Sequence, residues 1–273
     1  MNIQAGTTVA ALQAGLPLEP LENRILLCHA LGLTRVGLIT QSGRTVRQDE
    51  ASALAALVER RLSGEPIAYI VGRREFFGLE FRVTDAVLIP RPDTELLVEL
   101  ALELLPPQGS VLDMGTGSGA IAVAIAHTRR DAQVTALDVS PAALDIARQN
   151  TVANGARVRL VQSDWFGAIE GERFDMVVSN PPYIAAGDVH LSQGDLRFEP
   201  PGALTDNADG LSALRTIAAG APAHLEAGGW LLMEHGYDQA AQVRDLLTGL
   251  GYHDVASWRD LGGIERVSGG RAP

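Results

Sequence analysis

The sequence contains no lysine, and all 22 of its basic residues are arginine. P-loop and Schiff-base enzymes depend on a lysine, so these classes of chemistry are excluded, as is a lysine general base. The single cysteine, Cys28, cannot form an internal disulfide, which favours a cytoplasmic protein. No apolar run reaches the ~18 residues that a membrane-spanning helix needs. Residues 1–14 also lack the basic start of a signal peptide, so we expect no membrane partner.

Acidic residues outnumber basic ones, and the excess lies in one part of the chain. The formal net charge is −11 at pH 7. Residues 1–85 contain nine arginines and nine acidic residues, whereas residues 86–273 contain 13 arginines and 24 acidic residues. A nucleic-acid-binding surface needs a basic footprint, so we expect no direct nucleic-acid partner. An acidic domain is compatible with a basic protein partner. The six histidines have no metal-ligand spacing, and we expect no bound metal.

The first 74 residues have the pattern of short helices. Leu21–Leu31 carries apolar residues at helical spacing, beginning with Leu21 itself, and Arg47–Leu62 repeats this pattern. Gly32 and Gly64 follow the two segments as helix stops. We therefore predict a small N-terminal helical bundle at residues 1–74.

From residue 75 the period of the apolar residues changes. Bulky residues around Gly78 predict a β-hairpin, which we interpret as a linker at residues 75–86. Within residues 87–273, a helix begins at Arg91 and runs to about Leu105, and strand and helix patterns then alternate. This predicts an α/β fold with a doubly wound, mainly parallel, seven-stranded sheet whose last two strands pair antiparallel. The predicted strands are 111–114, 133–138, 157–162, 174–179, 230–234, 252–257 and 266–268.

A glycine-rich loop follows the first strand of this predicted sheet. It has the pattern Asp113-x-Gly115-x-Gly117-x-Gly119. Glycine permits the positive φ and the close backbone approach that a nucleoside requires there. Asp138 ends the next strand, where its carboxylate can accept hydrogen bonds from both ribose hydroxyls. From this loop alone a nicotinamide enzyme and a methyltransferase fit equally well, and a tight turn without ligand is the third interpretation.

A second candidate site follows the third predicted strand, at Ser163-Asp164-Trp165-Phe166. In a methyltransferase an acid here lies near the adenine amino group and an aromatic ring lies against the adenine face. In the alternative interpretation, Asp164 caps a helix and Trp165 belongs to the core. The position at the carboxyl end of a strand favours ligand contact for Trp165.

The tetrapeptide Asn180-Pro181-Pro182-Tyr183 directly follows the buried-strand pattern of residues 174–179. An amide nitrogen is a poor nucleophile because its lone pair is delocalised into the carbonyl. Two hydrogen-bond acceptors, one for each of its N–H bonds, localise that lone pair on the nitrogen. The Asn180 side-chain oxygen and the Pro181 carbonyl oxygen can be these acceptors. Pro182 has no N–H, the two prolines fix the turn, and Tyr183 offers a face for stacking and for a cationic sulfonium. An ordinary turn is the alternative, since Asn-Pro often opens one.

With these motifs in place, the chain closely resembles the HemK-type protein-glutamine methyltransferases. That family modifies the glutamine of the Gly-Gly-Gln motif in class I peptide chain release factors. The resemblance runs nearly end to end and has two mild departures, Met114 where an aliphatic residue is usual and Asp93 where glutamate is common. It rests on Glu65-Pro66-Ile67-Ala68-Tyr69-Ile70, Ile89-Pro90-Arg91-Pro92-Asp93-Thr94-Glu95, Asp113 to Ala122, Asn180 to Ile184, and Phe198-Glu199-Pro200.

The resemblance implies a class I methyltransferase domain at residues 87–273 that uses S-adenosyl-L-methionine and releases S-adenosyl-L-homocysteine. It implies a release-factor substrate that the N-terminal bundle helps to engage, and we expect the enzyme to act as a monomer. The substrate glutamine is held, and the catalytic contacts are made, by Asn180, Pro181, Pro182 and Tyr183. The implied cofactor-binding residues are Gly115, Thr116, Gly117, Ser118, Gly119, Asp138, Asp164, Trp165 and Asn180.

Other functions remain open at this point. A ribosomal-protein glutamine methyltransferase shares every motif, and a nucleic-acid amino methyltransferase has the same catalytic loop, although the acidic charge disfavours it. A non-catalytic adaptor does not need Gly115, Asp138 and Asn180 together. A nicotinamide oxidoreductase fits less well, because no histidine or lysine is placed for hydride chemistry. Arg91 and Glu199 fit a role at the site and a structural ion pair equally well.

Overall fold

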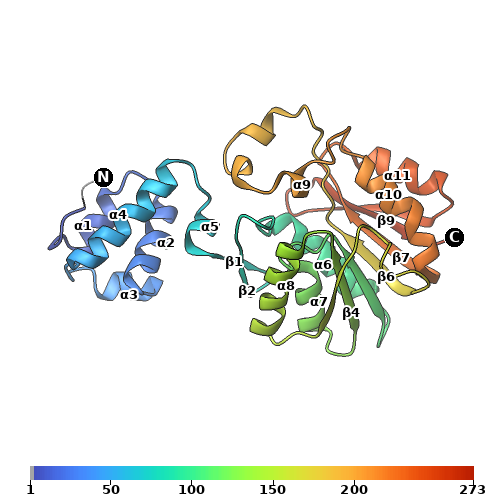
Figure 1. Cartoon of the computed structure of the whole chain (residues 1–273), viewed down its shortest axis with the longest axis horizontal. Helices are drawn as coiled ribbons and strands as arrows, with labels where there is room; N and C mark the ends of the chain where they lie inside the picture. Colours follow the sequence, from blue (N-terminus) through green and yellow to red (C-terminus); the bar gives the residue numbers. More distant parts are fainter. Residues whose placement is uncertain (1–2) are drawn as a thin grey trace. The chain divides into compact units, whose positions relative to one another are not determined.

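The protein is described by a computed structural model that covers residues 3–273. Its contacts divide the chain into two units, one that ends at Gly72 and one from Arg73 to Pro273 (Figure 1). Among the described residues no helix combines the length and the apolar character that crossing a membrane requires.

The first unit is a small helical bundle. The predicted helices at Leu21–Leu31 and Arg47–Leu62 are confirmed, and Gly32 ends the first of them with a φ of 62°. The expected apolar face was wrong in detail, because Leu21 is 54% exposed, while Leu26 and Leu27 are buried. The helices are α1 (Val9–Gly15), α2 (Pro20–Leu31), α3 (Arg35–Thr40), α4 (Gln48–Leu62) and α5 (Ile67–Val71).

The larger unit contains the predicted seven-stranded sheet, in the order β5-β4-β3-β6-β7-β9-β8. The first five strands in this order are parallel, and β9 runs antiparallel to both β7 and β8. The doubly wound, mainly parallel fold is thereby confirmed, with the last strand inserted beside β7. The strands are β3 (Ser110–Met114), β4 (Gln133–Asp138), β5 (Val158–Gln162), β6 (Phe174–Ser179), β7 (Leu225–Glu234), β8 (His253–Arg259) and β9 (Glu265–Arg271).

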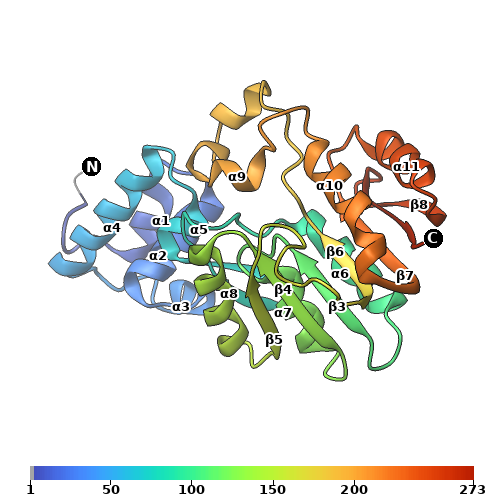
Figure 2. The same ribbon diagram turned by 45° about the vertical axis from the view of Figure 1, so that its right-hand side comes forward.

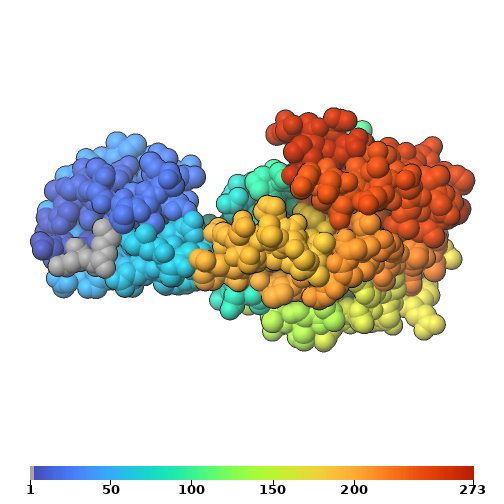
Figure 3. All heavy atoms as spheres, turned by 90° about the horizontal axis from the view of Figure 1, so that it is seen from above, coloured from blue at the N-terminus to red at the C-terminus, as the bar shows by residue number. Residues whose placement is uncertain are grey.

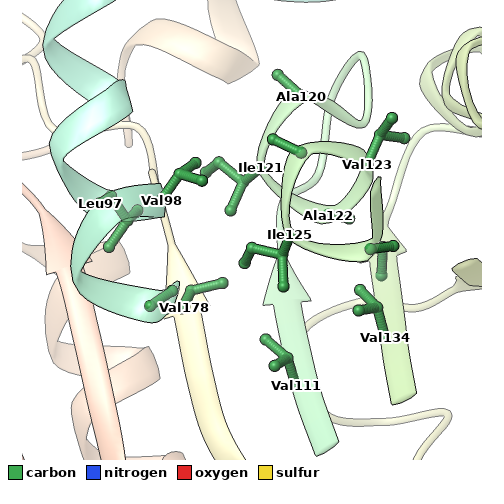
Figure 4. Packing of buried hydrophobic residues seen from close by; sticks show 14 of the residues in the cluster. Leu97, Val98, Val111, Ala120, Ile121, Ala122, Val123, Ile125, Val134 and Val178 are labelled. Atoms are coloured by element: carbon green, nitrogen blue, oxygen red, sulfur yellow. The ribbon is translucent and has the colours of Figure 1, made fainter. Parts of the chain in front are cut away.

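Helices cover both faces of the sheet because successive strand residues point to opposite sides. On β6, Met176 and Val178 pack under α6 and α7, whereas Val177 packs with α10 and α11 (Figures 1 and 4). The α-helices are α6 (Glu95–Leu104), α7 (Ala120–Thr128), α8 (Pro141–Ala153), α9 (Pro201–Leu204), α10 (Ser212–Gly220) and α11 (Ala240–Gly249). The 3-10 turns are η1 (Pro92–Thr94), η2 (Val189–Ser192), η3 (Leu196–Phe198) and η4 (Ala221–His224).

The predicted hairpin is present as β1 (Arg73–Phe76) and β2 (Leu79–Arg82). Its two central residues, Phe77 and Gly78, both have positive φ, 52° and 73°, as a type I′ turn requires. The side chain of Asn150 on α8 accepts from the Arg82 amide at 2.7 Å and donates to the Arg82 carbonyl at 3.0 Å. The hairpin, which belongs to the larger unit, is therefore fastened to α8.

Candidate active site

The two motifs that the sequence separates lie beside each other in the sheet. Strands β3 and β6 are hydrogen-bonded parallel neighbours, with Met114 opposite Ser179 (Figure 2). The Ser179 hydroxyl also donates to the Met114 carbonyl at 2.8 Å. The chain leaves β3 toward β4 and leaves β6 toward β7, on the other side, so the strand order reverses here. In doubly wound sheets such a switch point is where ligands bind.

The glycine loop after β3 has the backbone that the sequence analysis requires. Gly115, Gly117 and Gly119 have φ values of 70°, 54° and 83°. A Cβ on Gly119 would lie 3.2 Å from the Ala147 Cβ of α8, so this glycine permits close packing. A Cβ on Gly115 or Gly117 would meet nothing within 4 Å, so open space lies beside both. That space, and not internal packing, is what a cofactor needs at this loop.

The side chain of Asp113 holds the glycine loop by hydrogen bonds, a role that the sequence analysis did not assign. Its Oδ2 accepts from the Thr116 hydroxyl at 2.6 Å and from the Ala122 amide at 3.2 Å. Burial raises the pKa of this carboxyl to about 7, although both hydrogen bonds act in the opposite direction. Among residues 3–273 no group donates to its buried Oδ1. Asp113 is thus a buried carboxyl that supports the glycine loop through one oxygen and, within the described residues, has no partner for the other.

Asp138 at the end of β4 lies against the same loop. Its Oδ2 accepts from the Gly117 amide and its Oδ1 from the Ser140 amide, both at 2.9 Å. A carboxylate oxygen has two lone pairs, so each oxygen can still accept a ribose hydroxyl. The carboxylate thus fixes the loop and offers acceptors at once.

The residues after β5 divide between structure and site. Ser163 makes the turn, since its hydroxyl donates to the Trp165 carbonyl at 2.7 Å and accepts from the Ala168 amide at 3.0 Å. Between β5 and β6 the structure has turns and no helix, so the alternative in which Asp164 caps a helix was wrong, and its side chain is exposed. Trp165 is half-buried against the core with a φ of 49°, and Phe166 stacks on His224 at 4.6 Å.

Asn180 directly follows β6, and only the nitrogen of its side-chain amide is hydrogen-bonded within the described residues. Its Nδ2 donates to the Thr94 hydroxyl oxygen at 3.1 Å. The residues from 3 to 273 offer no hydrogen bond to its Oδ1. The Tyr183 hydroxyl donates to Glu234 Oε1 at 3.2 Å, and its burial raises the pKa of this phenol. The acceptor that the predicted chemistry requires is thus the free atom of Asn180.

Three residues that support this loop were missed by the sequence analysis. Gln239, just before α11, donates from Nε2 to the Tyr183 carbonyl at 3.0 Å and to the Gly210 carbonyl at 3.2 Å. Its Oε1 accepts from the Gly236 amide at 2.8 Å. Thr94 and Glu234 are the other two. A signal for Glu234 was present, because a carboxylate that ends a parallel strand lies at the same edge as the other motifs.

Arg91 and Glu199 form an ion pair with each other. Glu199 is buried, burial raises its pKa, and its Oε2 also accepts from the Ile89 amide at 3.0 Å. The pair connects segment 185–204, which lies on the surface of the larger unit, to the stretch before η1 (Figure 3). The ends of this segment are also bonded, since the Ile184 amide donates to the Leu204 carbonyl at 3.0 Å. Of the two interpretations of Arg91 and Glu199, the structural ion pair is the observed one.

Gly210 gives a direct test of the support beneath the catalytic loop. A Cβ at this position would lie 2.5 Å from the Tyr183 carbonyl oxygen, and its φ of 79° is unsuited to other residues. Gly210→Ala is expected to displace Tyr183 and to lower kcat by about tenfold or more. Steady-state kinetics check this against Gly187→Ala, where a Cβ meets nothing within 4 Å. Equal kcat values in the two variants would contradict a positional role for this contact.

Among residues 3–273, no three His, Cys, Asp or Glu side chains are grouped so as to hold a metal ion. The hydrogen-bond acceptors at the switch point suit an organic ligand, with a carboxylate at Asp138, an amide oxygen at Asn180 and open space beside the glycine loop.

Comparison with known proteins decides the family. A relative from Burkholderia pseudomallei, named "Release factor glutamine methyltransferase", is 56% identical and covers 97% of this chain and 96% of its own. A relative of the same name from Bordetella pertussis is 52% identical over 97% of this chain and 99% of its own. The chain belongs to the release factor glutamine methyltransferase family. Family models agree, with "PrmC N-terminal domain" at residues 8–72 and "Methyltransferase small domain" at residues 92–196.

Solved structures agree with the fold of this family. A methyltransferase from Pyrococcus furiosus has a TM-score of 0.56 at 20% identity and covers 78% of this chain and 96% of its own. A T. thermophilus 16S rRNA N2 methyltransferase, solved with AdoMet and guanosine, has a TM-score of 0.53 at 21% identity. It covers 74% of this chain and 50% of its own. At such identities the likeness concerns the methyltransferase fold and not the substrate.

Proposed function

We infer that this protein transfers a methyl group from S-adenosylmethionine to the side-chain amide nitrogen of the Gly-Gly-Gln glutamine in class I release factors. The observation that carries this function is the near full-length identity of 44–56% to relatives named for that reaction. The relatives described above carry this name, which favours a release factor over the alternatives, a ribosomal protein or a nucleic acid.

The proposed chemistry begins with the substrate amide. Asn180 Oδ1 accepts one N–H of the glutamine side chain, and the Pro181 carbonyl accepts the other. The nitrogen lone pair is then aimed along the line of the bond between sulfur and methyl carbon. An N–C bond forms as the S–C bond breaks, S-adenosylhomocysteine leaves, and the nitrogen loses one proton to water. In-line positioning of this kind supplies up to ~7–11 kcal/mol of the barrier reduction.

The free Oδ1 of Asn180 supports this proposal for the catalytic loop. Had both ends of the amide been engaged within the protein, no acceptor would remain for the substrate. Pro182 adds no donor that competes for the same acceptors. Tyr183 fixes the far end of the tetrapeptide through Glu234 and Gln239.

For the cofactor, we propose that Gly115 to Gly119 line its amino-acid and ribose parts. Asp138 accepts the ribose hydroxyls, Asp164 lies near the adenine amino group, and Trp165 lies against the adenine face. The exposed carboxylate of Asp164 and the half-buried ring of Trp165 support this assignment. The cofactor supplies an electrophilic methyl on a cationic sulfur.

We further propose residues 1–74 as the substrate-engaging domain, 75–86 as the linker and 87–273 as the catalytic domain of a monomeric, cytoplasmic enzyme. The match of residues 8–72 to a separate family model supports the first boundary. The acidic excess of residues 86–273 suits a basic protein partner better than a nucleic acid. The enzyme is therefore expected to pass through a heparin column without retention.

Substrate and target atom are tested together by transfer of radiolabelled methyl to purified, unmodified release factor. A parallel sample carries the release factor with its Gly-Gly-Gln glutamine replaced by alanine. We expect label in the first sample and none in the second. Label in ribosomal proteins but not in release factor would overturn the proposed substrate, and label in both release factors would overturn the target residue.

A further inference from the structure

The carboxylate of Glu234 is hydrogen-bonded to the last residue of the catalytic tetrapeptide, Tyr183. Glu234 ends β7, the strand next to β6, and is 1% exposed. Its Oε1 accepts from the Tyr183 hydroxyl at 3.2 Å. Among the described residues no donor meets hydrogen-bond geometry at its Oε2, while the nearby Thr94 hydroxyl lowers its pKa. Thr94 in turn accepts from Asn180 Nδ2 at 3.1 Å. Glu234 thus holds Tyr183 by a hydrogen bond, and the Thr94 hydroxyl that lowers its pKa is the group that holds Asn180.

This arrangement determines which end of the Asn180 amide faces the substrate. A hydroxyl has one proton to donate. Next to an anionic carboxylate that proton points to the carboxylate, so Thr94 offers Asn180 only an acceptor. Asn180 must then present its NH₂ to Thr94, which leaves Oδ1 for the substrate. If Glu234 were a neutral donor, Thr94 could donate to Asn180 instead, and the amide would turn its NH₂ toward the substrate.

We propose that Glu234 is a positioning residue that, through Thr94, holds Asn180 with its oxygen toward the substrate amide and, through its own hydrogen bond, holds Tyr183. The proposal rests on the function proposed above for Asn180. It also explains why a carboxyl group without a full set of partners is kept in the core, where burial disfavours its charged form.

The ionisation of Glu234 should therefore control the rate. Burial raises its pKa to about 7, and Asp93 on η1 adds to the increase. The hydroxyls of Thr94 and Tyr183 and the Arg266 guanidinium on β9 act in the opposite direction. The ionised form, which orients Thr94, dominates above this pKa, so turnover is expected to rise with pH.

The test is Glu234→Gln, which keeps the size of the side chain and removes the charge. At pH 8 we expect kcat to fall by about a hundredfold, with the Kd of S-adenosylmethionine unchanged. The ratio of wild-type to variant kcat is expected to rise by about tenfold per pH unit below 7 and to level off above 8. Asp113, whose pKa is also about 7, is present in both proteins, so this ratio isolates Glu234.

Stability separates this role from a structural one. The folded pKa of Glu234 lies above the ordinary 4.5, so the native state is stabilised by the protonated form at low pH and loses that stability as pH rises through about 7. Glu234→Gln removes the cost of the buried charge, and its melting temperature at pH 8 is expected to be no lower than that of wild type. A loss of kcat that follows a lower melting temperature or weaker cofactor binding would overturn the proposal.

A second pair of variants tests the connection through Thr94. Thr94→Val removes the hydroxyl and is expected to lower kcat as Glu234→Gln does, whereas Thr94→Ser is expected to restore it. Suppose that Asn180→Ala is inactive but wild type and Glu234→Gln have nearly equal kcat at every pH. That result would refute only the positioning role of Glu234. An active Asn180→Ala would refute the catalytic loop itself, and the positioning role with it.

Discussion

Asn180→Ala is expected to lower kcat by about a thousandfold or more while leaving the fold and cofactor binding intact. Its Oδ1 is a free acceptor at the switch point and is the atom that we propose takes one N–H of the substrate amide. The variant removes no core volume, since Asn180 is only half-buried. The measurement is single-turnover transfer of labelled methyl to release factor at saturating cofactor, with circular dichroism of the same sample.

Asn154→Ala is the matched control, because it removes an amide side chain from the same unit without touching the proposed chemistry. Asn154 donates from Nδ2 to the Glu80 carbonyl at 3.0 Å and so fastens the hairpin. Its loss is expected to leave kcat close to the wild-type value. Turnover of Asn180→Ala at the rate of the control would show that the substrate amide is activated elsewhere.

Strands were predictable from the sequence because the parallel sheet is buried on both faces. The predicted bounds of β4 and β6 match the structure, and each is a short apolar run that ends at a polar residue. The face of α2 was less predictable. The helical spacing of its apolar residues allowed two adjacent faces to be the buried one. Only the packing of Leu26 and Leu27 inside the bundle shows that the buried face does not include Leu21.

Within the candidate site, the residues that face the ligand were predictable and those that hold them were not. Asn180 and the glycine loop stand at strand ends, where topology alone brings them together. Thr94 lies 86 residues before Asn180, and Glu234 lies 51 residues after Tyr183. No local pattern connects them, because η1 and β7 are far from the loop in the sequence and only the fold brings Thr94 and Glu234 to it. The turn that Ser163 holds after β5, in place of a helix that Asp164 could cap, was likewise not visible in the sequence.

Asp138→Ala is expected to act on the cofactor and not on the chemical step. The carboxylate holds the Gly117 and Ser140 amides, both at 2.9 Å, and retains lone pairs for two ribose hydroxyls. Hydrogen bonds to a charged group contribute about 1.5–3 kcal/mol each, so the Kd of S-adenosylmethionine should rise by about a hundredfold. Isothermal titration calorimetry measures this directly.

Asp138→Asn sharpens the test because it keeps one acceptor oxygen of similar shape. That oxygen can hold either the Gly117 amide or a ribose hydroxyl but lacks the charge that strengthens both, so about a tenfold increase in Kd is expected. At saturating cofactor both variants should retain kcat, since the Asn180 side chain is held by Thr94 and not by Asp138. An unchanged Kd in Asp138→Ala would refute the ribose assignment. A loss of kcat at saturation would instead mean that the glycine loop also aligns the methyl group, and the separation between holding the cofactor and orienting the substrate amide would fail.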